Sequence, residues 1–201
     1  MKIQSLMVSD PITITEETTI ENALALMKEN RIRHLPVVDR KKKLTGWITL
    51  SDLKQGLIPS MLGDVSLSDI VNRDPYTVSP DEDIEAAAKL VYRHKISGMP
   101  VINDGELVGV ITETDLFRAF IDMMGILTAS SRIDVVVDES PASLRKALQV
   151  VQESGADIIS ISHTPLPEAR RICYFRLQSC KTEGIKRSLE AEGFEILTAL
   201  D

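Results

Sequence analysis

Apolar and polar residues follow the same order twice along the first part of the chain. In each case a short extended segment leads into a helix whose apolar residues fall at positions i, i+3, i+4 and i+7. Two strand-like runs joined by a polar turn come next, followed by a second helix. The apolar helical positions are Ile20, Ala23, Leu24 and Met27 in the first stretch and Ile84, Ala87, Ala88 and Val91 in the second. The pattern predicts two β-α-β-β-α units.

The two stretches are copies of one unit, as the spacing of their matching residues indicates. Pro36 and Pro100 are 64 residues apart, whereas Asp52 and Asp115, which follow the polar turn, are 63 apart. The single change of length therefore falls in the turn, where two copies of a fold tolerate it.

The pattern changes after the second copy, and residues 128–131 are expected to form a linker. The remaining residues read as strand, helix, strand, strand, helix and strand, which is the ferredoxin-like split β-α-β-β-α-β arrangement. We therefore expect an α+β protein with units at residues 1–62, 63–127 and 131–201.

Residues with capping chemistry mark the starts of two predicted helices. Thr18 and Glu21 have the spacing of a capping box. Ser140 is a natural N-cap, and Pro141 suits the first helical turn. These residues predict helices that begin directly after Thr18 and Ser140.

Composition and charge limit the class of protein. With 43% hydrophobic and 26% charged residues, the chain can form packed cores. It lacks an apolar run of the roughly 18 residues that span a membrane, and residues 1–11 lack the apolar core of a signal peptide. The net charge of −7 opposes binding to a phosphate backbone. We expect a cytoplasmic protein that binds neither membrane nor nucleic acid.

Catalytic and metal-binding motifs are not found. The sequence contains no phosphate-binding loop, nucleophile elbow, dinucleotide fingerprint or zinc-protease motif. Cys173 has no basic or histidine neighbour in sequence, so a structural thiol is expected. His34, His94 and His163 lie in separate segments and do not form a ligand set. We therefore expect a binding protein rather than an enzyme, without a metal.

A repeated Gly-x-Ile-Thr-x-x-Asp element carries the candidate chemistry. It places Thr49 at the end of a strand and Asp52 in the first turn of a helix, and it does the same for Thr112 and Asp115. A helix start favours a phosphate, and an aspartate can accept hydrogen bonds from sugar hydroxyls. The same spacing also occurs in a capping box, which needs no ligand. The residues alone leave both interpretations open.

The paired units resemble a tandem pair of cystathionine-β-synthase (CBS) domains, in their HLPVV and GMPVI strands and their GWITLSD and GVITETD ends. Similar domains bind adenosine compounds in the clefts between paired units through such threonines and aspartates. The resemblance therefore implies a regulatory, ligand-sensing protein for AMP, ADP, ATP or S-adenosylmethionine, which forms a homodimer and acts on an unidentified effector protein. It implies nucleotide contacts at Thr13, His34, Leu35, Pro36, Thr49, Asp52, Thr77, Gly98, Met99, Pro100, Thr112, Asp115 and Arg118.

The two expected sites differ in sequence. His34 stands where the second copy has Gly98. A glycine lets a base approach the backbone closely, whereas a histidine narrows the cleft or stacks on the base. Arg118, one turn after Asp115, could reach a phosphate or pair with that carboxylate. We expect one site to bind better than the other.

Residues 131–201 resemble an ACT domain, a small-ligand regulatory fold, in the DESPASL segment at 138–144. Similar domains hold an amino acid against the start of the first helix, where this chain has Ser140, Ala142 and Ser143. Because Ala142 stands where that family usually has glycine, we expect this unit to pair chains and to bind amino acids weakly or not at all. The domain order also resembles that of acetoin-utilisation accessory proteins.

Two other functions stay open at this point. The chain could be a constitutive dimeric adaptor with empty clefts, or a nucleotide-processing enzyme with an unrecognised site. ATP turnover that Asp115→Ala abolishes would favour the enzyme. The adaptor requires that no small molecule raise the melting temperature.

Overall fold

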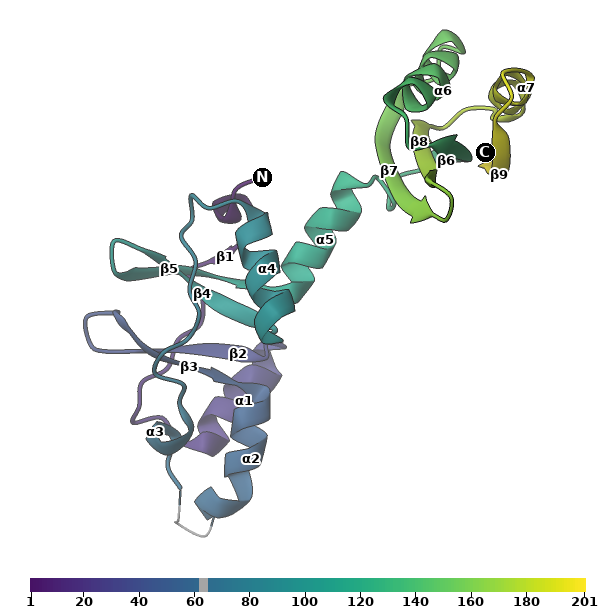
Figure 1. The fold of residues 1–201 in the computed structure, drawn as a ribbon. Helices are drawn as coiled ribbons and strands as arrows, with labels where there is room; N and C mark the ends of the chain where they lie inside the picture. The colour runs from purple at the N-terminus through teal and green to yellow at the C-terminus, as the bar shows by residue number, and fades with distance from the viewer. Residues whose placement is uncertain (62–64) are drawn as a thin grey trace. The chain divides into compact units, whose positions relative to one another are not determined.

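The computed structural model describes residues 1–61 and 65–201 (Figure 1). The chain divides into two compact units, Met1–Phe117 and Arg118–Asp201. The division falls within one helix, and each unit is described by itself. None of the described helices has the length and apolar character needed to cross a membrane.

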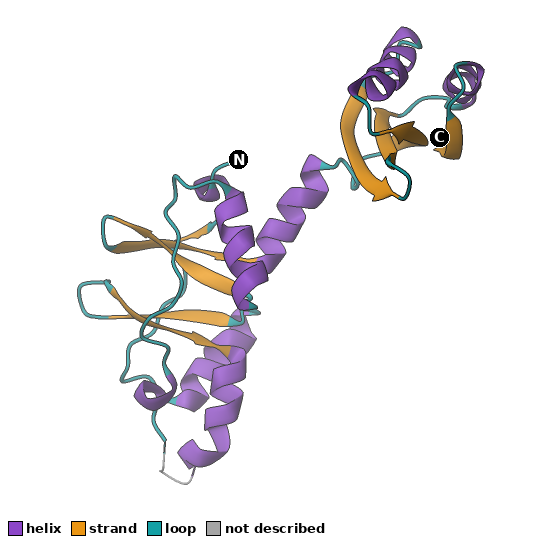
Figure 2. Ribbon diagram, in the orientation of Figure 1, coloured by secondary structure: helices purple, strands orange, loops and turns teal. Residues whose placement is uncertain are grey.

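The first unit contains two copies of the predicted order of elements. Its strands are β1 (Val8–Ser9), β2 (His34–Val38), β3 (Leu44–Thr49), β4 (Gly98–Asn103) and β5 (Glu106–Thr112). Its helices are the 3-10 helix η1 (Ile3–Ser5), α1 (Ile20–Asn30), α2 (Leu50–Met61), α3 (Leu67–Ile70), α4 (Ile84–His94) and the start of α5 (Glu113–Met123). The mixed α+β composition is plain in Figure 2.

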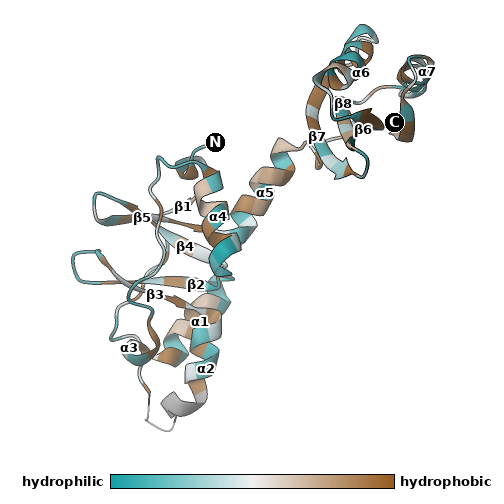
Figure 3. Cartoon of the chain, in the orientation of Figure 1, coloured by the Kyte–Doolittle hydropathy of each residue, from teal (hydrophilic) through white to brown (hydrophobic). Residues whose placement is uncertain are grey.

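Each copy is built on an antiparallel hairpin, β2–β3 in the first and β4–β5 in the second. The extended segment after each Asp-Pro adds a parallel bridge to the hairpin, between Ile14 and Val37 in one copy and between Val78 and Val101 in the other. The turns of both hairpins are hydrophilic (Figure 3), as the sequence predicts for solvated connections.

The segment that precedes each copy pairs with the hairpin of the other copy. β1 runs antiparallel to β5, with Val8 opposite Val110. At the matching place in the repeat, Asn72 and Trp47 exchange backbone hydrogen bonds of 2.8 and 3.0 Å. The two copies are therefore interlocked, so residues distant in sequence come together at both hairpin ends.

A separate apolar core fills the first copy. α1 contributes its buried face because the apolar residues recur with the helical period. The buried cluster consists of Ile14, Ile20, Ala23, Met27, Leu35, Val37, Ile48, Leu53 and Leu67. The N-cap of α1 is Thr19, whose side chain accepts the Asn22 N–H at 3.2 Å. The prediction of Thr18 as the capping residue was wrong by one position.

The second unit has the predicted β-α-β-β-α-β order. Its elements are β6 (Ser130–Asp138), α6 (Pro141–Glu153), β7 (Ile158–Leu166), β8 (Arg170–Gln178), α7 (Glu183–Ala191) and β9 (Glu195–Leu200). The antiparallel sheet has the order β7-β8-β6-β9, which leaves β7 and β9 at its edges. Ser140 caps α6 by accepting the Ser143 N–H, as predicted.

The core of the second unit lies between the sheet and its two helices. Alternate residues of β6 and β8 point to the covered face, which is the period expected of strands with one face buried. The buried cluster consists of Ile133, Val135, Val137, Ala147, Val151, Cys173, Phe175, Leu177, Ile185 and Leu189. Cys173 is thus a core thiol, and burial raises its pKa.

Candidate functional site

The threonine and aspartate of each repeated element form a capping box at a helix start. The hydroxyl and the N–H of Thr49 both donate to Oδ2 of Asp52, at 2.7 and 2.9 Å, and the Asp52 N–H donates to the Thr49 hydroxyl at 3.3 Å. The matching distances between Thr112 and Asp115 are 2.6, 2.9 and 3.4 Å. The capping interpretation is therefore correct for both helices.

The caps leave one oxygen of each carboxylate unused. The hydrogen bonds that each carboxylate accepts from its threonine both fall on Oδ2. Among the described residues, Oδ1 of Asp52 and of Asp115 accepts no hydrogen bond. An ionised carboxylate can accept about four hydrogen bonds in all. Capping and ligand binding are therefore compatible in the same side chain.

One cleft of about 370 Å³ lies at the start of α5, and we call it the Asp115 cleft. The second copy contributes Thr112 and Asp115, while the first copy contributes His34 and Arg33. Arg33 forms an ion pair of 3.3 Å with Glu113 at the same helix start. The complete lining is Val8, Asp10, Pro11, Ile12, Arg31, Ile32, Arg33, His34, Val110, Thr112, Thr114 and Asp115.

A second cleft of about 440 Å³ lies at the start of α2, and we call it the Asp52 cleft. Here the first copy contributes Thr49 and Asp52, and the second copy contributes Ser97 and Gly98. The complete lining is Trp47, Thr49, Ser51, Asp52, Asp69, Ile70, Val71, Asn72, Pro75, Tyr76, Lys95, Ile96, Ser97 and Gly98. The two clefts are thus built from matching positions of the repeat with the copies exchanged.

The imidazole of His34 lines one cleft and contacts two residues that line the other. Its Nε2 lies 2.7 Å from Oγ of Ser97, and its ring stacks on Trp47 with centroids 5.4 Å apart. His34 lines the Asp115 cleft, whereas Ser97 and Trp47 line the Asp52 cleft. At the matching position of the second copy, a Cβ on Gly98 would lie only 3.2 Å from Cε1 of His34. We call the group formed by His34, Trp47, Ser97 and Gly98 the shared wall. It has space for one side chain between positions 34 and 98, and His34 fills that space.

The environment of His34 favours the neutral ring. Burial lowers its pKa below the ordinary value, and the positive charge of Arg33 lowers it further. The carboxylates of Glu113, Asp115 and Asp52 act in the opposite direction and are outweighed. A neutral imidazole can donate or accept at Ser97, depending on its tautomer.

The structure brings six of the predicted contact residues to the clefts. These are His34, Thr112 and Asp115 in one cleft and Thr49, Asp52 and Gly98 in the other. The other predicted residues are not among the described linings: Leu35, Pro36, Met99 and Pro100 are buried in β2 and β4, and Thr13 and Thr77 are exposed. Arg118 is 80% exposed, with its Nε 3.9 Å from the Asp122 carboxylate rather than paired with Asp115.

Several lining residues were missed by sequence reasoning, although the repeat contained a signal for them. They occupy matching positions in the two copies: Ile12 and Tyr76, Arg33 and Ser97, and Ser51 and Thr114. Each of these positions adjoins an element that the sequence had already singled out. A systematic comparison of all matched positions near those elements would have found them.

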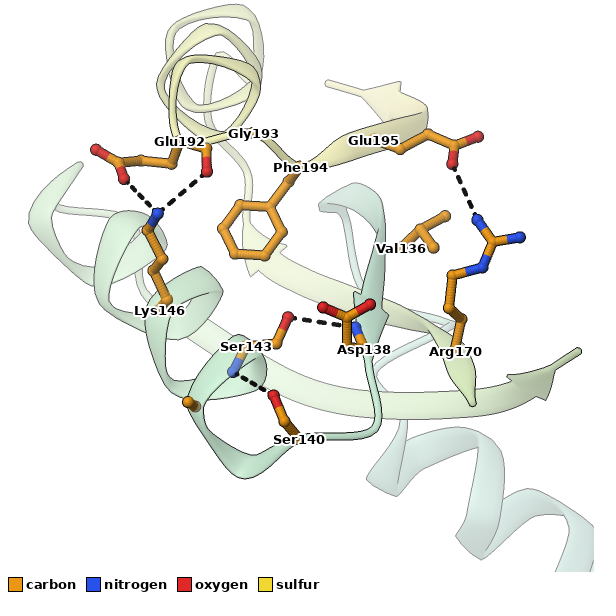
Figure 4. A pocket seen from close by; sticks show the side chains of 11 residues that line it. Val136, Asp138, Ser140, Ser143, Lys146, Arg170, Glu192, Gly193, Phe194 and Glu195 are labelled. Carbon is orange, nitrogen blue, oxygen red and sulfur yellow. Dashed lines mark hydrogen bonds and ion pairs between the residues drawn. The ribbon is translucent and has the colours of Figure 1, made fainter. Parts of the chain in front are cut away.

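A further pocket of about 470 Å³ lies in the second unit, at the start of α6 (Figure 4). Ser140, Ala142 and Ser143, the predicted amino-acid loop, line it. Its two cationic side chains are already paired: Nζ of Lys146 lies 2.7 Å from the Glu192 carboxylate, and Arg170 lies 3.8 Å from that of Glu195. A carboxylate ligand would have to compete with both glutamates. Elsewhere, the described residues hold no group of three or more histidines, cysteines, aspartates or glutamates suited to a metal.

Comparison with known families identifies the two copies. Residues 3–58 and 67–122 each match the family described as CBS domain. The inosine-5'-monophosphate dehydrogenase of Korarchaeum cryptofilum is 29% identical over 163 residues, which are 81% of this chain and 33% of that protein. The homoserine O-acetyltransferase of Methanococcoides burtonii is 36% identical over 58% of this chain and 23% of its own length. The chain therefore spans a third or less of these curated relatives.

Solved structures similar to the first unit include ligand complexes. The CBS domain pair of protein MJ0100, in complex with 5'-methylthioadenosine and S-adenosyl-L-methionine, is 30% identical, with a TM-score of 0.55 over 60% of this chain and 95% of that one. CBSX2 in complex with AMP is 25% identical, with a TM-score of 0.53 over 60% and 96%. An acetoin utilization protein (AcuB) from Vibrio cholerae is 30% identical, with a TM-score of 0.56 over 63% and 94%.

Proposed function

Because the chain belongs to the CBS-domain family, we propose that it is a regulatory protein whose two clefts bind an adenosine-containing ligand. The observation that carries this proposal is the free Oδ1 of Asp52 and Asp115, each beside a helix start in a cleft of several hundred Å³. Two ribose hydroxyls can donate to such an oxygen. Similar CBS pairs are solved with AMP and with S-adenosyl-L-methionine.

The remaining groups of each cleft suit the other parts of a nucleotide. The starts of α2 and α5 carry partial positive charge, which favours a phosphate. Ser51 and Thr114 add hydroxyl donors at the same places. The base would lie against the hairpin ends, near Gly98 in one cleft and His34 in the other. AMP, ADP and ATP are therefore the first ligands to test, followed by S-adenosylmethionine.

A regulatory role is supported more strongly than catalysis. The curated relatives are enzymes, but this chain matches only a third or less of their length. In the part that it shares, the clefts offer capped carboxylates already engaged by threonine hydroxyls rather than a free nucleophile and base. We infer that ligand binding is read by an effector protein or by a change of assembly.

We also infer that the protein is a homodimer. Each CBS copy has about 60 residues, a size that buries too little surface to be comfortable alone. The second unit adds two edge strands, β7 and β9, whose unpaired backbone groups can extend a sheet to another chain. Its pocket is less suited to an amino acid, since both cationic side chains are paired. Light scattering at micromolar concentration tests this, because a mass near 22.3 kDa would exclude the dimer.

A thermal-shift panel on the full chain tests the ligand proposal. The panel contains AMP, ADP, ATP, S-adenosylmethionine and the twenty amino acids. A ligand at about 100 times its Kd stabilises the folded chain by roughly 2.7 kcal/mol, which raises the melting temperature by several degrees. We expect stabilisation by at least one adenosine compound and by no amino acid. If no compound stabilises the chain, the adaptor function is favoured instead.

A further inference from the structure

We propose that His34 couples the two clefts, so that occupancy of the Asp115 cleft is transmitted to the Asp52 cleft. This inference rests on the proposed function, since it needs a ligand in both clefts. It identifies one side chain as the connection between them. The reason lies in the geometry of the shared wall rather than in the caps, which are alike in both clefts.

The imidazole belongs to one cleft and holds residues of the other. His34 itself lines the Asp115 cleft. Its Nε2 is 2.7 Å from the Ser97 hydroxyl, and its ring is stacked on Trp47 at an interplanar angle of 22°. Both of these partners line the Asp52 cleft. A base that enters the Asp115 cleft must contact or displace His34, and either event alters the two residues that the imidazole holds.

The backbone around this wall leads to both helix starts. His34 is the register partner of Thr49, and Gly98 is the register partner of Thr112. The carbonyl of Ser97 accepts the N–H of Glu113 at 3.0 Å, at the beginning of α5. Ser97 therefore joins the start of α5 to the imidazole. A shift of His34 can therefore move the cap of α2 through its strand partner Thr49, and the start of α5 through the hydrogen bond to Ser97.

The wall is packed too tightly for His34 to move alone. The side chain is only 7% exposed, and that of Trp47 only 5%. A Cβ on Gly98 would approach Cε1 and Nε2 of His34 to 3.2 and 3.3 Å. Since packed interiors have few voids, a displaced imidazole must push its neighbours. Coupling between two ligand sites of this kind typically changes affinity by about 5 to 150-fold.

The chain carries its own reporter of this event. Trp47 is the single tryptophan of the sequence, and it is in ring contact with His34. Its fluorescence depends on that neighbour. In an Asp52→Asn variant, we expect AMP to bind with higher affinity in the Asp115 cleft, where Trp47 is not a lining residue. A change of Trp47 emission in this variant therefore reports events in the Asp115 cleft through the wall.

The experiment combines AMP titration by calorimetry and by Trp47 emission, on the full chain. In Asp52→Asn we expect both signals to saturate together. In Asp52→Asn with His34→Gly, which copies the other repeat, the AMP affinity of the Asp115 cleft should change, because His34 lines it. The emission change should be lost even at AMP concentrations that calorimetry shows to saturate this variant. Ser97→Ala in place of His34→Gly keeps the ring stack and should reduce the change, which covers the case of a variant that fails to fold. Asp52→Asn with Asp115→Asn should give neither signal over the range of AMP concentrations that saturates Asp52→Asn.

Three results would overturn the inference. If calorimetry shows AMP in the Asp115 cleft while Trp47 emission stays constant, the clefts are not coupled through His34, although the proposed function survives. The same holds if the emission change persists in both wall variants. If AMP and the other adenosine compounds give no heat with the unaltered chain, the proposed function fails and the coupling fails with it. By reciprocity, a true coupling also makes the two AMP affinities of the unaltered chain interdependent by at least about fivefold.

Discussion

The Asp52 and Asp115 clefts have the same chemistry at their helix starts and different chemistry in their walls. The cap distances agree within 0.1 Å between the copies. The walls differ, because the Asp52 cleft has Trp47 and Gly98 where the Asp115 cleft has Val110 and His34. The carboxylates of Asp52 and Asp115, which could bind a sugar, keep the same geometry because each also caps a helix. Residues without such a duty are free to diverge and to set which ligand binds.

A second histidine beside His34 should have the strongest effect on stability and binding. Gly98→His places a second imidazole where even a Cβ lies 3.2 Å from His34. Overpacking of this kind costs about 1–3 kcal/mol of stability, and position 98 lies in the lining of the Asp52 cleft. We expect a lower melting temperature and a loss of about 100-fold or more in affinity at that cleft. Thermal melts and calorimetry with AMP measure both.

The matched control moves the histidine instead of adding one. His34→Gly combined with Gly98→His keeps a single imidazole in the wall, so most of the stability should return. Residues in contact show such non-additive behaviour in double-mutant cycles. The cleft with the higher AMP affinity in the unaltered chain should also become the weaker one, or the difference between the two affinities should shrink. If the two changes are simply additive, the wall positions do not compete for space.

The next largest effect separates the cap from the ligand contact. An amide side chain can replace a carboxylate at the third helical position of a capping box, but its nitrogen cannot accept a hydrogen bond from a ribose. Asp52→Asn should therefore leave stability within about 0.5 kcal/mol and weaken its own cleft by about 1.5–3 kcal/mol, the value of a hydrogen bond to a charged group. Asp115→Asn should do the same at the other cleft. Equal affinities in variant and unaltered chains would mean that both carboxylates are caps alone.

The pH dependence of stability should show a contribution from His34. Because its pKa is lowered in the folded chain, the unfolded chain binds the proton first as the pH falls. The contribution of His34 to the free energy of unfolding is complete above the unfolded pKa of about 6.5. It is lost as the pH falls from there toward the pKa of the folded chain. Urea unfolding at about pH 7.5 and pH 5.5 measures it. His34→Asn should remove this part of the slope, whereas His163→Asn, at an exposed position, should keep it.

The smallest expected effect concerns the phosphate. The Asp115 cleft has Arg33 where the Asp52 cleft has Ser97, so it offers one more cation. Arg33 is half exposed and shares its charge with Glu113, and exposed pairs contribute only about 0.2–1 kcal/mol. Arg33→Ser should weaken AMP at this cleft by less than about fivefold and leave adenosine unchanged. An equal loss for adenosine would show that Arg33 acts by packing rather than by charge.

The sequence allowed the order of the elements and the cap at Ser140 to be predicted because both depend on local spacing. It placed the cap of α1 one residue too early. The helical period, the turn between strands and the Thr-x-x-Asp element each lie within a few residues of one another. The wall does not, since His34 and Ser97 meet only because the two copies interlock. The contacts assigned to Thr13 and Thr77 stay predictions, because these side chains are exposed and lie outside the described linings.

The domain boundaries show the same limit. The hydrophobic periodicity shows where each copy begins in the sequence. It does not show which hairpin the first residues of that copy pair with. Val8 belongs to the first copy by sequence order and pairs with β5 of the second. No local signal in the sequence specifies that exchange, because it depends on the register between strands about 100 residues apart in the chain.

A crystal structure of the chain grown with AMP would show which oxygen of each aspartate contacts the ligand. In the proposed function, the cap leaves Oδ1 of Asp52 and Asp115 available for a ribose while Oδ2 holds the threonine. We expect ribose hydroxyls at about 2.5–3.0 Å from Oδ1, with both Thr–Asp hydrogen bonds intact. AMP bound elsewhere, or bound in the clefts without contact to either aspartate, would contradict this proposal.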